Sequence, residues 1–222
     1  MPGVEQKSSI IIGSSFLRTN FTSQSLRLLS YLSSMYFEDQ EFKSINYTTN
    51  VFSPGEYEYC RFIQCDFSGI NLSGIRFTDC RFEDCNLSMV KLGGTGFNDT
   101  LFGDCKMLGL HFEHCQQLPF SVSFQGCNLS HSSFYGVKLK QASFKQCIMQ
   151  EVDFSNAELQ EANFDGCDLL NAAFENTNLE KADLTTAINF SIDPEKNRLK
   201  KAKFSTSGLA GLLNKYDLRI EP

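Results

Sequence analysis

The sequence predicts an all-β, four-sided solenoid, and three observations support this prediction. From Cys60 to Ala187 the chain reads in fives, such as CDFSG and ANFDG, whose third residue is Phe, Leu or Met, apart from one short break. The first residue of each five is small or moderately apolar. All nine cysteines fall at this first position, and six of them follow one another at intervals of 20 residues, with a single interval of 22. A fixed period of this kind sets the architecture of a chain.

A period of five fits neither regular secondary structure, because apolar residues recur every 3.6 positions in helices and every 2 in strands. It fits a chain that turns a corner every five residues and points the first and third residues inward. Four such sides make one turn of about 20 residues, which lies within the usual range for solenoids. The cysteine spacing matches this turn, so we expect a column of inward thiols along one side.

The fives CDFSG, CNLSH, ANFDG and ADLTT resemble the pattern A-(D/N)-(L/F)-(S/T)-x of the pentapeptide-repeat family. The resemblance covers 128 of the 222 residues. It implies a right-handed quadrilateral β-helix, in which the third residues stack along the axis and the first residues lie beside them. The 21 phenylalanines and the absence of tryptophan agree with a stacked axial core.

The chain divides into three parts. Residues 1–36 form an N-terminal extension, read either as loose fives or as a short helix. Aromatic residues recur every five positions from Phe37, so the solenoid is expected over 37–187, with a phase break at 115–122. Pro119 lies in this break and favours a bulged corner, because proline has no N–H for a ladder hydrogen bond. Two interpretations of this break remain open, a local bulge and a loop that binds a partner.

Residues 188–222 are expected to cap the solenoid, since an open coil end would expose unpaired backbone groups. Ser205 or Ser207 can start a short α-helix that ends at about Tyr216. Four apolar residues of this helix fall at positions i, i+3, i+4 and i+7 and form one face. We predict this face as a homodimer contact, and the resemblance implies the same role for the C-terminal helix and tail. The four residues are Leu209, Leu212, Leu213 and Tyr216.

No arrangement for catalysis is recognisable, so we expect no enzyme activity, cofactor or metal. His111, His114 and Cys115 include metal-ligating residue types, but the register of the fives turns both imidazoles outward and the thiol inward. Ligands that diverge in this way cannot close a tetrahedral site. The sequence also contains no phosphate-binding loop and no pairing of a nucleophile with a base.

The cysteine positions also indicate the cellular compartment of the protein. An odd number of inward cysteines indicates small core residues with reduced thiols rather than a disulfide framework. No secretory signal and no apolar run of about 20 residues is visible. We therefore predict a cytoplasmic protein without a membrane segment.

The charge distribution is the main functional signal. Residues 60–187 contain 16 acids and 9 bases, residues 188–222 contain 4 acids and 7 bases, and the net charge of the chain is −6. This balance argues against direct nucleic-acid binding through a basic surface. Acids keep a rod soluble, but an acidic rod can also imitate the charge and width of duplex DNA. The predicted partner-binding acids are Asp79, Asp84, Asp99, Asp104, Asp165 and Asp168.

The resemblance suggests which partner such a rod would have. The C-terminal segment from Ile192 to Glu221 is similar to the tail of the microcin-immunity branch of the family, and the coil is similar to that of the Qnr branch. This similarity implies a DNA mimic that binds DNA gyrase or topoisomerase IV and protects it from a toxin or a quinolone-type drug. A generic scaffold that binds another protein is the alternative.

Overall fold

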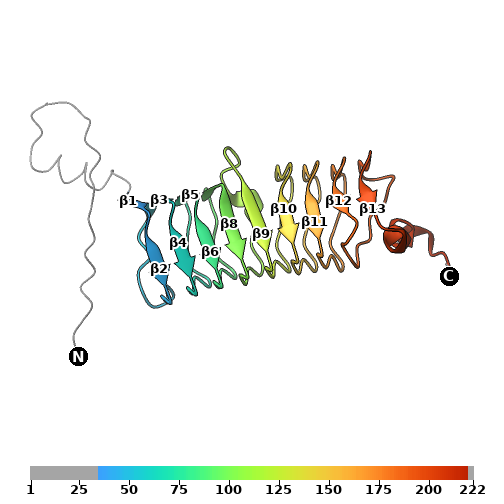
Figure 1. Ribbon diagram of the computed structural model, residues 1–222. Coiled ribbons are helices and arrows are strands. Elements are labelled where there is room, and N and C mark those ends of the chain that lie inside the picture. The colour runs from blue at the N-terminus through green and yellow to red at the C-terminus, as the bar shows by residue number, and fades with distance from the viewer. Residues whose placement is uncertain (1–34, 220–222) are drawn as a thin grey trace, which may run out of the picture.

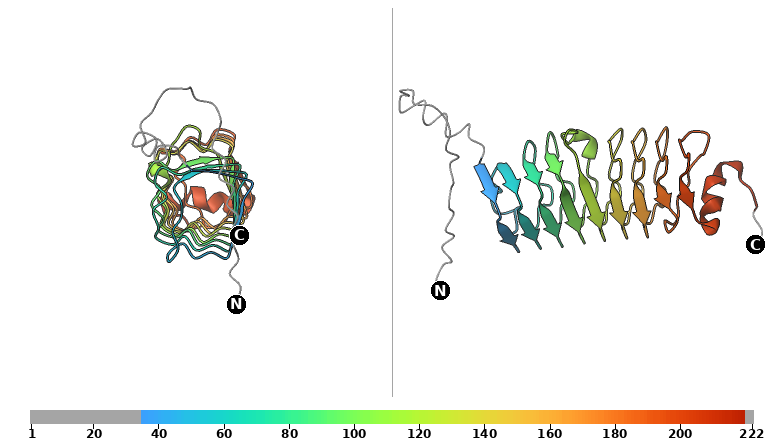
Figure 2. Two further views of the ribbon diagram at one scale, coloured as in Figure 1. Left: turned by 90° about the vertical axis from the view of Figure 1, so that its left-hand side faces the viewer. Right: turned by 45° about the horizontal axis from the view of Figure 1, so that its top comes forward.

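The computed structural model describes residues 35–219 of the chain. The loose fives expected around Phe16, Phe21 and Leu26 therefore lie outside the described residues. The described chain winds into a four-sided coil that forms a straight rod (Figure 1), and the view along the rod shows its quadrilateral cross-section (Figure 2, left). We name the sides A, B, C and D in the order in which the chain passes along them.

The strands form two parallel sheets on adjacent sides. The sheet on side A has four strands: β1 (Met35–Glu38), β3 (Gly55–Glu58), β5 (Arg76–Thr78) and β7 (Gly96–Asn98). The sheet on side B has nine: β2 (Glu41–Lys43), β4 (Arg61–Ile63), β6 (Arg81–Glu83), β8 (Thr100–Gly103), β9 (Val122–Gln125), β10 (Ser143–Lys145), β11 (Asn163–Asp165), β12 (Asp183–Leu184) and β13 (Lys203–Phe204). Sides C and D are joined by single parallel bridges, such as Asn46↔Asp66 and Asn71↔Lys91.

The register confirms that one turn is four fives. Phe62 pairs with Phe82 and Phe82 with Phe102, in steps of 20 residues, and Phe102 pairs with Phe124 across the break, in one step of 22. The structure thus confirms the predicted fold class, an all-β, right-handed quadrilateral β-helix of the pentapeptide-repeat type. Both sheets are parallel, and the chain forms a β-solenoid.

The core consists of the inward first and third residues of the fives. Phe144, whose side chain is fully buried, stacks between Phe124 and Phe164 with ring centroids 5.4 and 5.1 Å away. All nine cysteines are free thiols and are buried. Many thiols donate to a carbonyl of the preceding coil, as Cys167 does to Phe144 O at 3.4 Å. The inward assignment of the cysteines is therefore confirmed.

Many corners of the coil lie at the fifth residue of a five, in the left-handed backbone conformation. Asp, Asn and Gly adopt positive φ at the least cost, and they recur at these corners. In one column of corners, Asp84 and Asp104 have φ of 53° and 50°, and Gly126 follows with φ of 66°. The coil geometry thus explains part of the aspartate content without any function.

The phase break lies on side A and fills a whole side rather than a corner. After the 3-10 helix η1 (Phe112–His114), residues 115–121 leave the ladder and form a loop that rises above the start of β9 (Figure 1). Backbone N–H groups of Gln116 and Ser121 donate to Thr95 O and Phe97 O, at 2.9 and 3.0 Å, and hold both ends of the loop. Between them Leu118 is 74% exposed.

The coil continues beyond residue 187, where the regular fives end. Asn178 bridges to Arg198, and β12 pairs with β13 through Asp183↔Lys203. The solenoid is therefore longer at its C-terminal end than the predicted range of 37–187. The sequence pattern misses this turn because Asn197, rather than a small apolar residue, takes an inward place, where its amide donates to Phe174 O at 2.9 Å.

The cap begins later than residue 188, after this added turn, and its helix starts after Ser205 as expected but is not an α-helix. Ser205 Oγ accepts a hydrogen bond from Gly208 N at 3.1 Å and starts η2 (Thr206–Leu212), which η3 (Asn214–Tyr216) follows, and both are 3-10 helices. Gly208 and Gly211 lie against Phe190, so a Cβ on Gly211 would be 2.4 Å from Phe190 O. Glycine disfavours the α-helix, and short 3-10 turns suit such connections. The cap closes the end of the coil (Figure 2, left).

Among the residues that the structure describes, no helix is long and apolar enough to cross a membrane.

Candidate protein-binding surface

The acidic character of the rod belongs to its N-terminal half. Residues 35–114, the first four coils, contain 12 acids and 6 bases, whereas residues 115–219 contain 12 acids and 11 bases. With coils about 4.8 Å apart, the first half carries one net negative charge per about 3 Å of axis. Duplex DNA carries one per about 1.7 Å. The first four coils thus reach about half the linear charge density of DNA, and the second half is nearly neutral.

Four of the predicted acids gather on two columns in this half. Asp79 and Asp99 lie at the corner between sides A and B, and Asp84 and Asp104 lie at the corner between sides B and C. All four are exposed and have positive φ, because each is the fifth residue of its five. Members of a column are one coil apart, so each column presents carboxylates about 4.8 Å apart.

The structure does not bring the other two predicted acids to these columns. Asp165, in β11, accepts a hydrogen bond from Thr186 Oγ1 at 2.7 Å. Asp168 is half-buried and accepts from Gln150 Nε2 and Asn189 Nδ2 at 2.7 and 2.8 Å. Burial raises the pKa of Asp168, but these hydrogen bonds outweigh burial and the net pKa is lowered. Asp168 therefore serves the rod's own structure, whereas Asp165 is exposed and accepts a single side-chain hydrogen bond, as Asp99 does from Ser121 Oγ at 2.8 Å. Both residues lie in the second half of the rod.

Side A carries opposite charges on the two sides of the break, which sequence reasoning missed. Its first four rows hold six acids and one base, and its last four rows hold six bases and three acids. The acids of the first rows are Glu38, Asp39, Glu56, Glu58, Asp79 and Asp99. The bases of the last rows are Lys138, Lys140, Lys181, Arg198, Lys200 and Lys201. Writing the sequence in rows of 20 would have revealed this division, since charges in register share a side.

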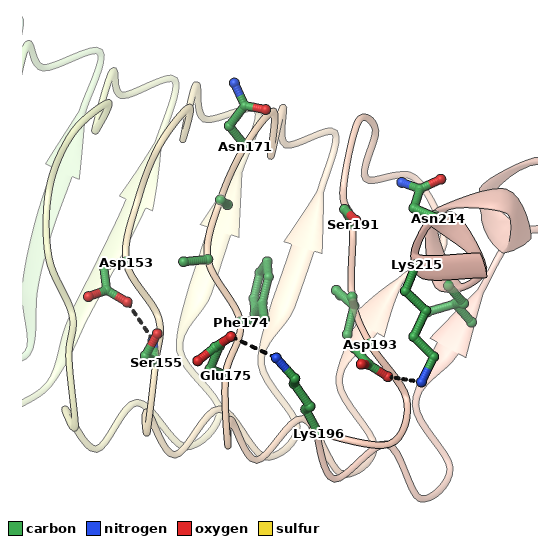
Figure 3. Close-up of a pocket in the computed structure, with 15 residues that line it drawn as sticks. Asp153, Ser155, Asn171, Phe174, Glu175, Ser191, Asp193, Lys196, Asn214 and Lys215 are labelled. Carbon is green, nitrogen blue, oxygen red and sulfur yellow. Dashed lines mark hydrogen bonds and ion pairs between the residues drawn. The ribbon is translucent and has the colours of Figure 1, made fainter. Parts of the chain in front are cut away.

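A groove of about 750 Å³ separates the last coils from the cap (Figure 3). Ala172, Phe174, Ile192 and Leu212 are among its apolar lining residues. It exists because the ladder of side D opens here. Phe154 N donates to Ala173 O, as in the earlier coils, but Phe174 N finds no backbone acceptor within residues 35–219. Ile192 N instead donates to Gly211 O in the cap, at 3.0 Å.

Ion pairs fasten the rim of this groove. Lys196 Nζ lies 3.0 Å from Glu175, and Lys215 Nζ lies 2.7 Å from both Asp193 and Glu195. The hydrogen bond from Lys215 is the main reason that the pKa of Asp193 is below its usual range. It lowers the pKa of Glu195 in the same way. The two pairs of Lys215 hold the cap to the last coil, whereas the pair of Lys196 joins the last two rows of side D.

The predicted dimer residues lie on the cap, mostly in solvent. Leu209, Leu213 and Tyr216 are exposed, whereas Leu212 packs partly against the core. Tyr216 donates its hydroxyl hydrogen to Glu195 Oε1 at 2.9 Å. An apolar surface therefore remains at this end of the rod.

The histidine and cysteine cluster does not form a metal site. The rings of His111 and His114 lie 5.3 Å apart on the surface, and His111 Nδ1 contacts Glu113 at 2.9 Å. Cys115 is buried, and burial raises the pKa of its thiol. In the described part of the chain, no three His, Cys, Asp or Glu side chains are placed to hold a metal ion.

A parallel four-sided β-solenoid with stacked aromatic residues and charged outer faces defines a class of repeat proteins that present surfaces rather than active-site clefts. The family described as "Pentapeptide repeat region" matches residues 55–118 and 120–211, and the chain belongs to this family. No curated protein matches the sequence.

Solved structures are similar to this chain at low sequence identity, and the likeness to HetL supports the fold. HetL, a pentapeptide repeat protein involved in heterocyst differentiation regulation from Nostoc sp. strain PCC 7120, is 14% identical with a TM-score of 0.60, over 86% of this chain and 96% of HetL. A trypsin-treated variant of QnrB1, a plasmid-mediated fluoroquinolone resistance protein, is 20% identical with a TM-score of 0.49, over 84% of this chain and all of QnrB1. A protein from the Arabidopsis thaliana thylakoid lumen is 23% identical with a TM-score of 0.18, over 55% of this chain and 67% of that protein. At these identities the likeness concerns the fold alone.

Proposed function

We propose that this protein is a non-catalytic binding rod whose acidic first four coils occupy the DNA-binding groove of a type II topoisomerase, DNA gyrase or topoisomerase IV. In doing so it would act as a DNA mimic and protect the enzyme from a toxin or a quinolone-type drug. The observation that carries the proposal is the concentration of net charge in residues 35–114, with exposed carboxylates on the columns of Asp79 and Asp99 and of Asp84 and Asp104.

The rod is suited to this role because its charges are fixed in advance. The corner carboxylates sit on a backbone that the stacked core holds rigid, so binding orders few groups. A positive groove attracts such a surface over a distance and speeds association. The same negative charge repels phosphate, so the rod does not bind nucleic acid directly. A charge density about half that of DNA lets the enzyme release the rod in exchange for its substrate.

A generic protein-binding scaffold is the second candidate, and one observation favours it. Residues 115–219 are nearly neutral and carry mixed charges, and they contain the groove beside the cap. A uniform DNA mimic has no use for these features, whereas a scaffold for another protein can use them. The experiment below separates the two candidates.

We further propose that the exposed cap residues Leu209, Leu213 and Tyr216, with Leu212 behind them, join two rods end to end. A twofold interface uses the same patch on both chains, so one such face suffices. This dimer places the acidic halves at its far ends, where each can occupy one groove. Removing residues 206–222 should then leave a monomeric coil with a weakened effect on gyrase.

The proposed location is the cytoplasm. Nine buried free thiols suit a reducing compartment, in which disulfides seldom form.

The test is a gyrase supercoiling assay with the full chain, in the presence and absence of a quinolone. The key variant combines Asp79→Asn, Asp84→Asn, Asp99→Asn and Asp104→Asn. Asparagine tolerates positive φ as aspartate does, so the variant removes charge without straining the corners. The control removes the same number of charges from the second half of the rod, by Asp153→Asn, Asp165→Asn, Asp168→Asn and Asp183→Asn.

We expect the wild type to restore supercoiling in the presence of the drug. For the same effect, the corner variant should require a protein concentration at least about tenfold higher. The control should resemble the wild type. If the wild type does not affect gyrase, the generic protein-binding scaffold is the better candidate function. If both variants lose activity equally, the corner columns are not the binding surface.

A further inference from the structure

Side A is organised symmetrically about the phase break. It consists of nine rows, one from each coil, and the break is the fifth row. The rows are residues 35–39, 55–59, 75–79, 95–99, 115–121, 137–141, 157–161, 177–181 and 197–201. The later rows belong to the same side because each runs between a row of side D and a strand of side B, as the first four do. Four rows therefore lie on each side of Leu118.

When the order is reversed, the outermost and the innermost pairs of rows carry charges of opposite sign. The first row presents Glu38 and Asp39, and the ninth presents Arg198, Lys200 and Lys201. The fourth row presents Asp99 and the sixth Lys138 and Lys140. The two intermediate pairs are mixed. Arg76 and Asp79 of the third row face Glu158 and Glu161 of the seventh. The second row likewise places its two glutamates opposite Glu180 and Lys181 of the eighth.

In the outer rows, Arg198 pairs with Glu180 of the eighth row, but the remaining charges that the structure describes there make no ion pair. Within residues 35–219, Glu38 and Asp39 make no ion pair, and neither do Lys200 and Lys201. By contrast, Arg76 pairs with Glu56 and Lys181 with Glu161 inside one copy. The charges at both ends of side A are thus available to a second molecule.

We propose that two copies of this chain associate side by side and antiparallel through side A, with the twofold axis passing beside Leu118. Each row then faces the row that is equally far from the break in the other copy. A twofold interface must be self-complementary, and reversal satisfies this condition, whereas a parallel arrangement would place acids against acids. The exposed Leu118 and Pro119 meet their own copies at the axis and are removed from water there.

The size of the contact indicates a weak and reversible dimer. Eight intervals of about 4.8 Å make side A about 38 Å long. With a width of about 12 Å, two copies bury on the order of 900 Å² in total, below the range of standard stable interfaces. Most of the attraction comes from exposed charges, so salt should weaken it strongly.

This dimer goes beyond the proposed function and does not depend on it. It uses the side of the rod, whereas the end-to-end contact uses the cap, so the two do not exclude each other. It also covers the acidic rows of side A with bases of the same protein. Self-association would therefore compete with any basic partner and keep the rod inactive at high concentration and low salt.

A disulfide trap tests the geometry directly. Leu118→Cys places a thiol beside the twofold axis, and Met89→Cys places one at an equally accessible corner between sides C and D, since Met89 is 66% exposed. The nine native thiols are buried in both variants. Under mild oxidation at low ionic strength, Leu118→Cys should form a covalent dimer about tenfold faster than Met89→Cys, because the contact raises the effective thiol concentration. High salt should abolish the difference.

A charge swap tests the pairing of rows. In the Leu118→Cys background, Glu38→Lys with Asp39→Lys, or Lys200→Glu with Lys201→Glu, should each slow the disulfide trapping to the rate of Met89→Cys. The fourfold variant should restore the faster trapping. Both residue types already occupy left-handed corners, as Lys201 and Glu161 show, so folding should survive. Equal trapping of Leu118→Cys and Met89→Cys, or a fourfold variant trapped no faster than the two double variants, would overturn the proposal. An end-to-end dimer without trapping at Leu118 would do so too.

Discussion

Replacing Phe144 by alanine is the sharpest test of the axial core. The ring has no exposed area, stacks on Phe124 and Phe164, and meets Phe134 and Phe154 edge to face at 5.9 and 6.0 Å. Phe144→Ala removes the ring's burial and leaves a cavity whose walls belong to three coils. We expect the free energy of unfolding to fall by about 3–5 kcal/mol, the usual range for a buried phenylalanine replaced by alanine.

Phe174→Ala is the matched control, because Phe174 ends the stack. It has one stacked neighbour, Phe154 at 5.2 Å, and it lines the groove, so its site can relax. We expect a loss of about 2 kcal/mol, below the usual range for a fully enclosed ring. Urea unfolding followed by far-ultraviolet circular dichroism measures both values, provided that the slope against urea is unchanged. A loss under about 1 kcal/mol for Phe144→Ala, or equal losses for both variants, would refute the stacking argument.

Three other predictions concern the thiols and the cap. Alkylation of the folded protein followed by mass spectrometry should modify few of the nine cysteines, and rapid labelling of several would contradict their burial. Gly211→Ala should detach the cap at a cost of about 1–3 kcal/mol, because its Cβ would meet the Phe190 carbonyl, whereas Gly103→Ala, with no atom nearer than 3.9 Å, should leave amide exchange in the cap unchanged. Because Lys215 lowers the pKa of Asp193, this contact stabilises the cap above the unfolded pKa of about 3.9 and is lost as the pH falls through the folded pKa. Amide exchange of residues 206–217, relative to the intrinsic exchange rate at each pH, should therefore rise below about pH 4. Because Lys215 lowers the pKa of Glu195 as well, the variant that should lose this dependence combines Asp193→Asn with Glu195→Gln.

The fold could be predicted from the sequence because one local rule repeats. Each five contributes the same two inward residues, so the register follows without knowledge of distant contacts. The rule fails where the inward residue changes type. Asn197 is buried through hydrogen bonds to Phe174 O and Asp193 O, and no hydrophobic pattern marks such a residue. The 3-10 cap escaped prediction for a related reason, since the close approach of Gly211 to Phe190 depends on where the last coil ends.

The candidate surface was predictable only in part. The acids themselves are visible in the sequence, but their grouping depends on which corner each occupies. Asp79 and Asp84 are five residues apart and lie on different corners, whereas Asp79 and Asp99 are twenty apart and lie in one column. Asp168 is the second residue of its five rather than the fifth, and Gln150 and Asn189 engage it within the rod. The role of a charged residue can therefore be judged here only when its position on the coil is known.

The loop of residues 115–121 also shows how a coil of this kind can accept new sequence. Its two ends are held by Thr95 O and Phe97 O, and the pairing of sides B, C and D passes it without a change in register. The segment between Gln117 and Phe120 can thus be lengthened while the neighbouring coils stay in place. A segment grafted there would project from the middle of the rod, so the break provides a ready insertion point for a binding loop on a rigid support.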